Sequence, residues 1–442
     1  MYAYLFATIA YVLTALCYAE LSSSYHQTGG AFTFAKRAFG RNVAFVAAWA
    51  LLLDYLVTIS ISALAAVGYV GYFFPVLHVP QITGLATLCV IVGLMTLNIV
   101  GLSESAKFSY FLVIFDLIGE ATVLIIGYVF SFKPGLNIIH FGTVPTYPSF
   151  LYAVTIAMSS YLGIEVISQS AGETKNASRN IPRAIFLISA TVVAATLAFS
   201  TLALGVLPYQ AFQQNPTSIN DPVSFIAEHL RYGWILGGLT AILGISVLTV
   251  AANAGVVGVS RITFAMSEEG VIPKFFGKLH KKYNSPYVSI IIFSLLAIAL
   301  AFSGRLDLVA ELYNFGALIA YMIVGLSMIS LRNKDRALVR PFKNPWSIRI
   351  KRVGQSRQEQ GTSSPNKANS ESATYYEIPV IGLLCFIADF IIWILVVILH
   401  PLGRTFGSAW MGAGLLMFYV YTKIKSSKNK EGSLRDFPSG AK

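Results

Sequence analysis

Long uninterrupted apolar stretches make up most of the chain, and short polar segments separate them. Each stretch is close to, or longer than, the roughly 20 residues that an α-helix needs to cross a bilayer. The stretches are continuous, unlike the alternating pattern of a membrane β-strand. We therefore predict about eleven membrane-spanning helices, the longest of them tilted or extended into loops. They are expected near 3–21, 43–72, 81–101, 108–131, 149–171, 184–206, 233–260, 287–303, 309–331, 379–400 and 405–422.

Composition supports an all-α integral membrane protein. Hydrophobic residues make up 55% of the 442 residues and charged residues only 12%, whereas soluble domains carry roughly 25% charged residues. The mean hydropathy is +0.66. A soluble protein of this length would expose far more polar surface, so a soluble fold is excluded.

The net charge of +12 is concentrated on one side of the predicted helices. With the loop after the first span placed in the cytoplasm, 28 of the 32 lysines and arginines lie on the cytoplasmic side, as the positive-inside rule requires. The charge therefore indicates orientation and not a nucleic-acid partner. The C-terminus is predicted to be cytoplasmic. Met1 would lie outside without a preceding signal, so we expect that one N-terminal helix is missing from this sequence.

The stretch 149–171 contains the most unusual polar residues of any predicted span. Ser159, Ser160, Gly163 and Glu165 interrupt it, and a basic loop follows. One interpretation is a broken helix that faces a substrate cavity, because unwound backbone at membrane depth survives only beside a cavity or inside protein. The alternative is close packing of helices through small residues. Gly163 alone would favour packing, but intramembrane acids are costly and usually functional, so Glu165 favours a substrate site.

Further acids lie in other predicted spans. Asp54 is in the middle of its span, and Asp116 and Glu120 lie one helical turn apart on one face. Each is a candidate for proton coupling, and each is equally compatible with a structural hydrogen bond between helices. Asp389 is a further intramembrane acid. Glu20 is close to the end of its span, where its carboxylate is expected to reach water.

Other chemistry is weakly indicated. Asn253 lies among small residues and fits a cavity ligand and a packing face equally well. The sequence carries no P-loop, no zinc-protease motif and no histidine cluster, and its three cysteines all lie in apolar runs. We therefore expect neither an enzyme nor a bound metal or cofactor.

Five motifs together resemble the amino acid–polyamine–organocation permeases, and the resemblance covers essentially the whole chain. Ala177 stands where that family usually has proline. The motifs are CYAELSSSYHQTGGAFTFAKRAFG (17–40), AAWALLLDYLVTISISA (47–63), YLGIEVISQSAGETKNASRNIPRAI (161–185), SRITFAMSEEGVIPKFFGKLHKKYNSP (260–286) and RPFKNP (340–345).

The resemblance implies a leucine-transporter-type fold, with two inverted five-helix repeats, two further helices, and broken first and sixth helices around a central site. Twelve helices are expected in the family, and by this comparison the first one is missing. The implied divisions are 1–131 for the first repeat, 132–333 for the second, 334–377 for a flexible cytoplasmic linker, 378–423 for two C-terminal helices and 424–442 for a cytoplasmic tail. The Ser- and Gln-rich composition of the linker also indicates flexibility.

The resemblance also implies a substrate site. The matching residues of the broken sixth helix are Ser159, Ser160, Tyr161, Gly163, Ile164 and Glu165. Tyr55 and Thr58 match cavity positions on the third helix, and Asn253 and Phe315 are further candidates. Some relatives carry a lysine on the fifth helix where this chain has Asp116, so the coupling mechanism stays open.

We interpret the chain as a permease of the cytoplasmic membrane that moves amino acids or related amines by alternating access. Coupling to protons or exchange is expected, through Glu165, Asp54, Asp116 or Glu120. The alternative hypothesis is a remnant or sensor of the same fold that binds a ligand without transporting it. The substrate, the direction of transport and the oligomeric state do not follow from the sequence.

Overall fold

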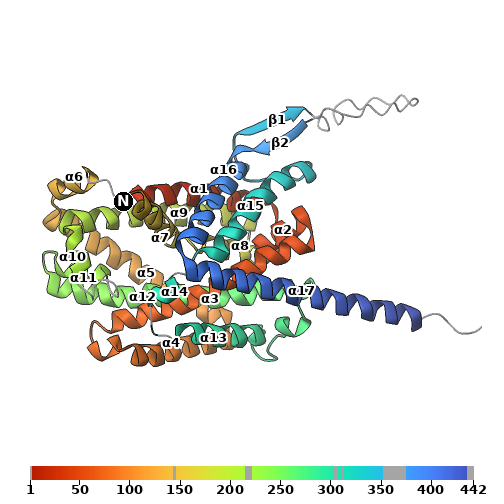
Figure 1. Ribbon diagram of the computed structural model, residues 1–442, viewed down its shortest axis with the longest axis horizontal. Helices are drawn as coiled ribbons and strands as arrows, with labels where there is room; N and C mark the ends of the chain where they lie inside the picture. Colours follow the sequence, from red (N-terminus) through yellow and green to blue (C-terminus); the bar gives the residue numbers. More distant parts are fainter. Residues whose placement is uncertain are drawn as a thin grey trace, which may run out of the picture.

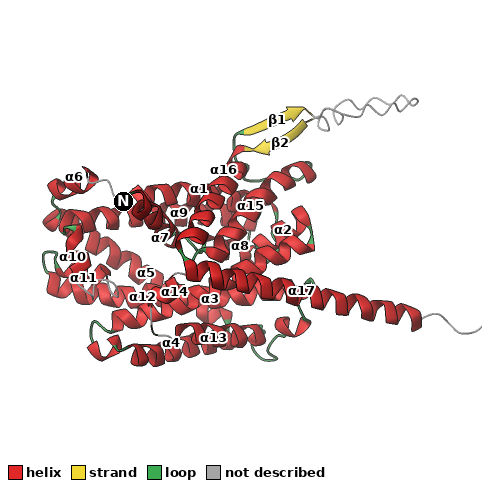
Figure 2. Ribbon diagram, viewed as in Figure 1, coloured by secondary structure: helices red, strands yellow, loops and turns green. Residues whose placement is uncertain are grey.

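The computed structural model describes residues 2–142, 146–214, 222–302, 304, 306–310, 312–351 and 375–435. Long helices lie side by side in one bundle, a β hairpin projects at one edge, and the last helix runs out beyond the bundle (Figure 1). Among the described residues, β1 and β2 are the only strands, as the colouring of Figure 2 makes plain. The predicted all-α class is confirmed.

The helices and strands follow in this order. The first half of the chain contains α1 (Tyr2–Ser24), α2 (Ala31–Phe39), α3 (Arg41–Val70), η1 (Pro75–His78), α4 (Pro80–Val100), α5 (Leu102–Ile126), η2 (Gly127–Ser131), α6 (Pro134–Gly142), α7 (Tyr147–Ser159), α8 (Ile164–Gln169), η3 (Ala171–Glu173) and α9 (Ala177–Val206). The second half contains α10 (Tyr209–Gln214), α11 (Pro222–Glu228), α12 (Gly233–Glu268), η5 (Lys274–Gly277), α13 (Tyr287–Ala301), α14 (Leu306–Ala310), α15 (Phe315–Lys334), β1 (Ser347–Lys351), β2 (Tyr375–Pro379), α16 (Val380–Leu399) and α17 (Pro401–Arg435).

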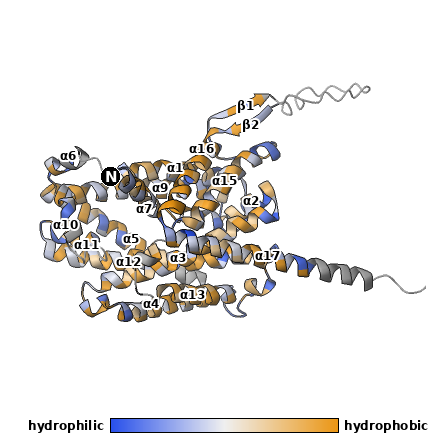
Figure 3. Ribbon diagram, in the orientation of Figure 1, coloured by the Kyte–Doolittle hydropathy of each residue, from blue (hydrophilic) through white to orange (hydrophobic). Residues whose placement is uncertain are grey.

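The predicted membrane spans coincide with these helices. In the described part of the chain, nine helical segments are long and apolar enough to cross a membrane, and α13 is a shorter apolar helix. The remaining predicted span, 405–422, falls within α17. Apolar residues cover the body of the bundle, while the hydrophilic colour gathers near helix ends and loops (Figure 3).

One predicted span is not continuous. The sequence predicts a single helix over 309–331, but α14 ends at Ala310 and α15 begins at Phe315. Asn314, at φ 74°, precedes α15 in the left-handed region, which asparagine tolerates better than most residues. Its side-chain amide donates to the Thr155 carbonyl on α7 at 2.8 Å. The prediction of an unbroken helix is therefore wrong at this point.

Helix α3 forms the centre of the bundle. Within its most apolar window, 83% of the residues are buried, compared with 17% for α9. Helix α12 packs along α3 through glycines, because a side chain at Gly255 would meet Ile59 and one at Gly258 would meet the ring of Tyr55 at 2.8 Å. Small residues allow helices to approach closely where lipid removes the hydrophobic driving force. Helix α3 therefore presents its side chains to several helices at once.

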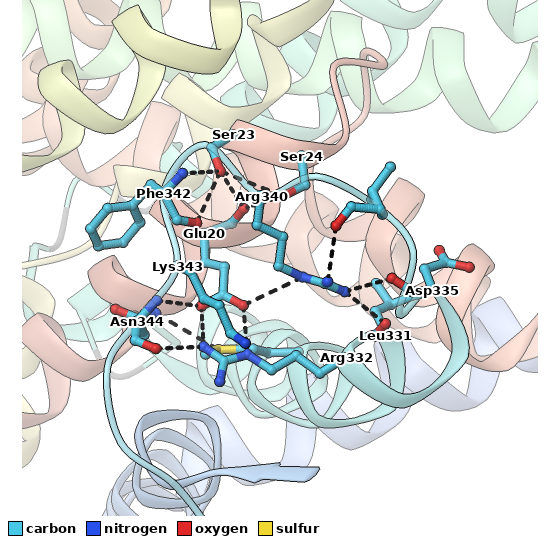
Figure 4. Close-up of polar contacts among 12 residues, drawn as sticks. Glu20, Ser23, Ser24, Leu331, Arg332, Asp335, Arg340, Phe342, Lys343 and Asn344 are labelled. Atoms are coloured by element: carbon cyan, nitrogen blue, oxygen red, sulfur yellow. Dashed lines mark hydrogen bonds and ion pairs between the residues drawn. The ribbon is translucent and has the colours of Figure 1, made fainter. Parts of the chain in front are cut away.

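A buried ion pair joins α1 to α15 near the β hairpin (Figure 4). The guanidinium of Arg332 donates to both carboxylate oxygens of Glu20, at 2.7 and 2.6 Å, and each side chain is only 1% exposed. The backbone N–H of Asn344 also donates to Glu20, at 2.8 Å. Glu20 therefore does not reach water, and the expectation from its position near a span end is wrong.

The same arginine ties the β hairpin to the bundle. Its Nη1 donates to the Ser347 hydroxyl at 2.6 Å and to Glu377 at 3.1 Å. Ser347 opens β1 and Glu377 lies in β2, and the two strands pair antiparallel. Within the predicted linker 334–377, β1 thus comes before residues 352–374, which lie outside the described residues, and β2 begins directly after them.

Two carboxylates outside the spans are held in their charged form. Burial raises the pKa of Asp335, but hydrogen bonds from Tyr25 and Arg37 outweigh burial and keep the pKa below its ordinary value. Burial also acts on Glu377, and there Ser347, Lys343 and Arg332 hold the pKa below its ordinary value. Both groups are therefore ionised at neutral pH and available for ion pairs.

We expect Glu20→Gln to lower the free energy of unfolding by about 3 kcal/mol or more, because it leaves the buried guanidinium of Arg332 without its main counter-charge. The measurement is a denaturant titration of the purified protein in detergent.

The matched control for this variant is Glu269→Gln. Glu269 pairs with Lys36, and these side chains are 44% and 34% exposed, so the loss should stay below about 1 kcal/mol. Equal losses for the two variants would contradict a dominant role for the buried pair.

Candidate functional site

The predicted interruption of the span 149–171 is present in the structure. Helix α7 ends at Ser159 and α8 begins at Ile164, so residues 160–163 lie outside both helices. Gly163 has φ 108°, in the left-handed region that favours glycine. A side chain at this position would meet no atom within 4 Å. Glycine therefore suits this position because of its backbone conformation and not because a side chain would clash with a neighbour.

Glu165 closes the interruption from the α8 side. Its carboxylate accepts the N–H of Gly163 at 3.2 Å and the hydroxyl of Tyr321, on α15, at 2.6 Å. The side chain is completely buried, and its second oxygen, Oε1, has no partner within the described part of the chain. Glu165 therefore links the unwound backbone to α15 while half of its hydrogen-bonding capacity is unused.

Helix α3 faces the interruption with Asp54, Tyr55 and Thr58. The hydroxyl of Tyr55 accepts a hydrogen bond from the amide of Gln169 on α8. The Thr58 hydroxyl donates to the backbone carbonyl of Asp54 at 2.8 Å and lies 3.3 Å from the Tyr313 hydroxyl. Asp54 is 3% exposed, and its Oδ1 has no partner within the described residues. The structure thus brings Tyr55 into contact with α8, with Asp54 next to it on α3 and Thr58 one turn away beside Tyr313.

The remaining predicted residues of the broken helix differ in exposure. Ser160 and Gly163 are exposed, Ser159 is half-buried, and Ile164 is buried. Tyr161 is buried and stacks on Tyr11 of α1, with ring centroids 5.0 Å apart. Its hydroxyl lies 2.7 Å from that of Thr8. The interruption therefore has an open side at Ser160 and Gly163 and a side packed against α1.

Four predicted residues lie away from this group. Asn253 bridges α12 to α4 and α5 through Asn98 at 2.6 Å and Ser109 at 3.0 Å. Phe315 packs against Trp393 of α16, at 5.7 Å between centroids, and against Gly407 of α17. Asp116 and Glu120 lie on α5, Asp116 buried and Glu120 half-buried. Of the two roles that the sequence left open for Asn253, these contacts fit the packing face between helices.

Sequence reasoning missed three residues that complete the group. Tyr321 binds Glu165, Gln169 binds Tyr55, and the ring of Tyr18, on α1, meets the ring of Tyr321 edge to face at 5.8 Å. Gln169 lies four residues after Glu165, so its place one turn further on the same helix was an available signal. The two tyrosines are single aromatic residues in apolar spans, and their positions depend on tertiary packing.

Gly316 lets α15 begin directly against α3 beside this group. A methyl group at this position would overlap the backbone carbonyl of Ala50 and lie 3.3 Å from the N atom of Asp54. Only glycine allows this approach without a shift of one helix. The distance between α15 and α3, and hence between Tyr321 and Asp54, therefore depends on Gly316.

Comparisons with known proteins give one consistent result. The family model described as amino acid permease matches residues 1–420. The low-affinity putrescine importer PlaP of Escherichia coli (strain K12) is 30% identical over 433 residues, 95% of this chain and 85% of that protein. The branched-chain amino acid permease BcaP of Bacillus subtilis (strain 168) is 28% identical over 366 residues, 77% of this chain and 75% of that protein. The methylthioribose transporter of the same organism is 25% identical over 446 residues, 97% of this chain and 86% of that protein.

We expect Gly316→Ala to destabilise the protein by about 1–3 kcal/mol, because the added methyl group must push α15 away from α3. The change is measured as a lower midpoint of thermal unfolding in detergent.

Gly93→Ala is the matched control, since Gly93 lies inside α4 with no atom within 4 Å of the added carbon. Alanine is favoured over glycine inside a helix by roughly 0.5–1 kcal/mol, so this variant should be as stable as the natural protein or slightly more stable. A Gly316→Ala protein that melts together with Gly93→Ala would argue against the tight contact.

Proposed function

This chain belongs to the amino acid permease family, and on that premise we propose that it is a secondary transporter that moves amino acids or related amines by alternating access. The single observation that carries the proposal is the interruption at residues 160–163 between α7 and α8. Discontinuous helices at membrane depth provide substrate sites in secondary transporters, because their free backbone groups serve as ligands. Ser159, Ser160, Tyr161, Gly163 and Ile164 are the proposed binding segment.

The surroundings of the interruption support a binding site. Tyr55 on α3 and Tyr321 on α15 come from two distant parts of the chain and contact Gln169 and Glu165 of α8. Thr58, one turn after Tyr55 on α3, lies beside the hydroxyl of Tyr313. Alternating access requires one group of helices to move relative to another around such a site. The site lies where α3 and α15 contact α8, so a relative movement of these helices would change access to it.

The substrate range rests on the relatives. Their names describe a branched-chain amino acid permease, a putrescine importer and a methylthioribose transporter. Amino acids and putrescine, named for two of these relatives, carry a primary ammonium group, which backbone carbonyls and carboxylates recognise, whereas methylthioribose is a sugar without one. We therefore place the substrate among small molecules that carry such a group.

Coupling to protons or to a counter-substrate completes the proposed mechanism. Asp54 and Glu165 are buried beside the interruption, and Asp116 and Glu120 lie on α5. Carboxylates inside membrane spans are the usual carriers of transported protons. Proton movement with the substrate would require one of these groups to change its protonation during transport. The proposed orientation places the C-terminus in the cytoplasm, from the distribution of basic residues.

We expect Gly163→Ala to reduce the uptake of the best substrate by up to about tenfold in proteoliposomes tested with labelled amino acids and amines. At φ 108° an alanine is strained by roughly 1–2 kcal/mol, which opposes the unwound conformation.

Gly40→Ala is the control for backbone strain. Gly40 has φ 90°, and a side chain there also meets no atom within 4 Å, but it lies between α2 and α3. With ψ −172°, Gly40 lies in a region that is essentially confined to glycine, so alanine is strained there at least as much as at Gly163, which has ψ −7°. An equal loss of uptake would therefore show that the interruption has no special role.

The coupling mechanism is tested separately with an imposed pH gradient. Proton-coupled uptake should rise when the outside is acidic and fall when an ionophore removes the gradient. Uptake that ignores the gradient but accelerates with substrate preloaded inside would assign the protein to exchange.

A further inference from the structure

Two carboxylates beside the interruption lack a cationic partner. Asp54 and Glu165 are 3% and 0% exposed, and a hydrogen bond links their helices, because Gln169, one turn after Glu165 on α8, donates to Tyr55, the residue next to Asp54 on α3. In the part of the chain that the structure describes, neither carboxylate forms an ion pair, whereas the buried Glu20 is paired with Arg332. A buried carboxylate is costly unless it is paired with a charge or binds a proton. This pair therefore needs a positive partner from another source.

Buried polar atoms around the two carboxylates are also unpartnered. They are Asp54 Oδ1, Glu165 Oε1, Gln169 Oε1 and the Tyr18 hydroxyl, and none has a hydrogen-bond partner among the described residues. Tyr18 and Gln169 are both completely buried, and the ring of Tyr18 contacts that of Tyr321, whose hydroxyl donates to Glu165. The carboxylate and amide oxygens are acceptors. A ligand that satisfies them must therefore donate several hydrogen bonds.

Aromatic rings surround the same place. Tyr321 donates to Glu165 at 2.6 Å, and the ring of Tyr18 meets the ring of Tyr321 edge to face at 5.8 Å. Tyr55 accepts a hydrogen bond from Gln169, and the hydroxyl of Tyr313 lies 3.3 Å from that of Thr58. The faces of tyrosine rings attract organic ammonium groups, and the attraction strengthens where water is excluded. Carboxylates, acceptor oxygens and aromatic rings together make a site suited to an organic cation.

We propose that Asp54 and Glu165 form a subsite for a diamine, and that the protein selects diamines over zwitterionic amino acids. This inference rests on the proposed transport function and narrows its substrate class. A diamine brings two ammonium groups and offsets both carboxylates. A zwitterionic amino acid brings one ammonium group together with a carboxylate, which the pair repels, and repulsion of the wrong ligand is an effective source of specificity.

The test compares three small compounds on the full chain in proteoliposomes. Putrescine carries two positive charges, n-butylamine carries one on a chain of the same length, and L-valine is a zwitterion. We expect putrescine to be taken up with a Michaelis constant at least about tenfold lower than that of n-butylamine, and L-valine to compete weakly or not at all.

Removal of either carboxylate charge should abolish this preference. In Asp54→Asn and in Glu165→Gln, we expect the ratio of the Michaelis constant of n-butylamine to that of putrescine to fall by about tenfold, because one ammonium group loses its counter-charge. Asp389→Asn is the matched control. Asp389 is a completely buried acid on α16 whose Oδ1, like the free oxygens of the pair, has no partner among the described residues. Its Oδ2 accepts hydrogen bonds from Thr14 and Cys385, and neither of these lies on α3 or α8, so its loss should leave the ranking of the three compounds unchanged.

Binding to the purified protein separates this inference from the transport function. The midpoint of thermal unfolding in detergent is measured with each compound, for the natural protein and for the three variants, after monodisperse gel filtration confirms folding. A putrescine-dependent rise that is lost in Asp54→Asn and Glu165→Gln supports the diamine subsite, even if no compound is transported; absent transport would count against the proposed function alone.

Two results would overturn the inference. One is transport or binding of L-valine in preference to putrescine, which would leave the transport function intact. The other is an unchanged ranking of the three compounds in Asp54→Asn and Glu165→Gln, together with loss of the response to a pH gradient. That second result would assign the two carboxylates to protons.

Discussion

A bilayer supplies no water to polar groups, so each buried donor and acceptor of this protein has to be satisfied by the chain itself or by a ligand. The long apolar helices meet this requirement for the backbone by their own hydrogen bonds. Wherever the chain departs from a helix at membrane depth, it supplies replacements. Gly163 donates its N–H to Glu165, and the amide of Asn314 donates to the carbonyl of Thr155. The two interruptions, one between α7 and α8 and one before α15, are thus held by side chains that act for the missing helical bonds.

Charged side chains are buried in two different ways. Glu20 uses both oxygens, on the guanidinium of Arg332 and the backbone of Asn344, and the same arginine reaches β1 and β2. Such a closed arrangement holds helices together and has no capacity left for a ligand. Asp54 and Glu165 each keep an oxygen without a partner among the described residues. A buried polar group that the fold leaves unsatisfied reduces stability, and it is retained where a ligand or proton completes it. Asp54 and Glu165, beside the interruption, fit the case in which a ligand or proton completes the buried group.

Sequence reasoning predicted the elements that depend on local patterns. The positions of the spans follow from continuous apolar stretches, and the interruption at Gly163 follows from a glycine and an acid in one of them. It failed where a distant residue decides the outcome. Glu20 is buried only because Arg332 lies opposite, and the helix before Phe315 breaks because Asn314 finds an acceptor on α7. From the sequence, Asn253 fitted a cavity ligand and a packing face equally well. In the structure its side chain bonds to Asn98 on α4 and to Ser109 on α5. In these cases the apolar pattern could not predict in which direction the side chain points from its helix.

The pairing of Glu20 with Arg332 also constrains the order in which the protein can be assembled. The two residues are 312 positions apart, on the first and one of the last membrane helices described here. During synthesis Glu20 is made long before Arg332, so its carboxylate lacks its main counter-charge until α15 arrives. The hairpin of β1 and β2 follows directly after α15 and closes over the pair. Completion of this contact is therefore a late event in biogenesis, and a ribosome that stops before residue 332 releases a chain in which α1 and α15 cannot be joined by this ion pair.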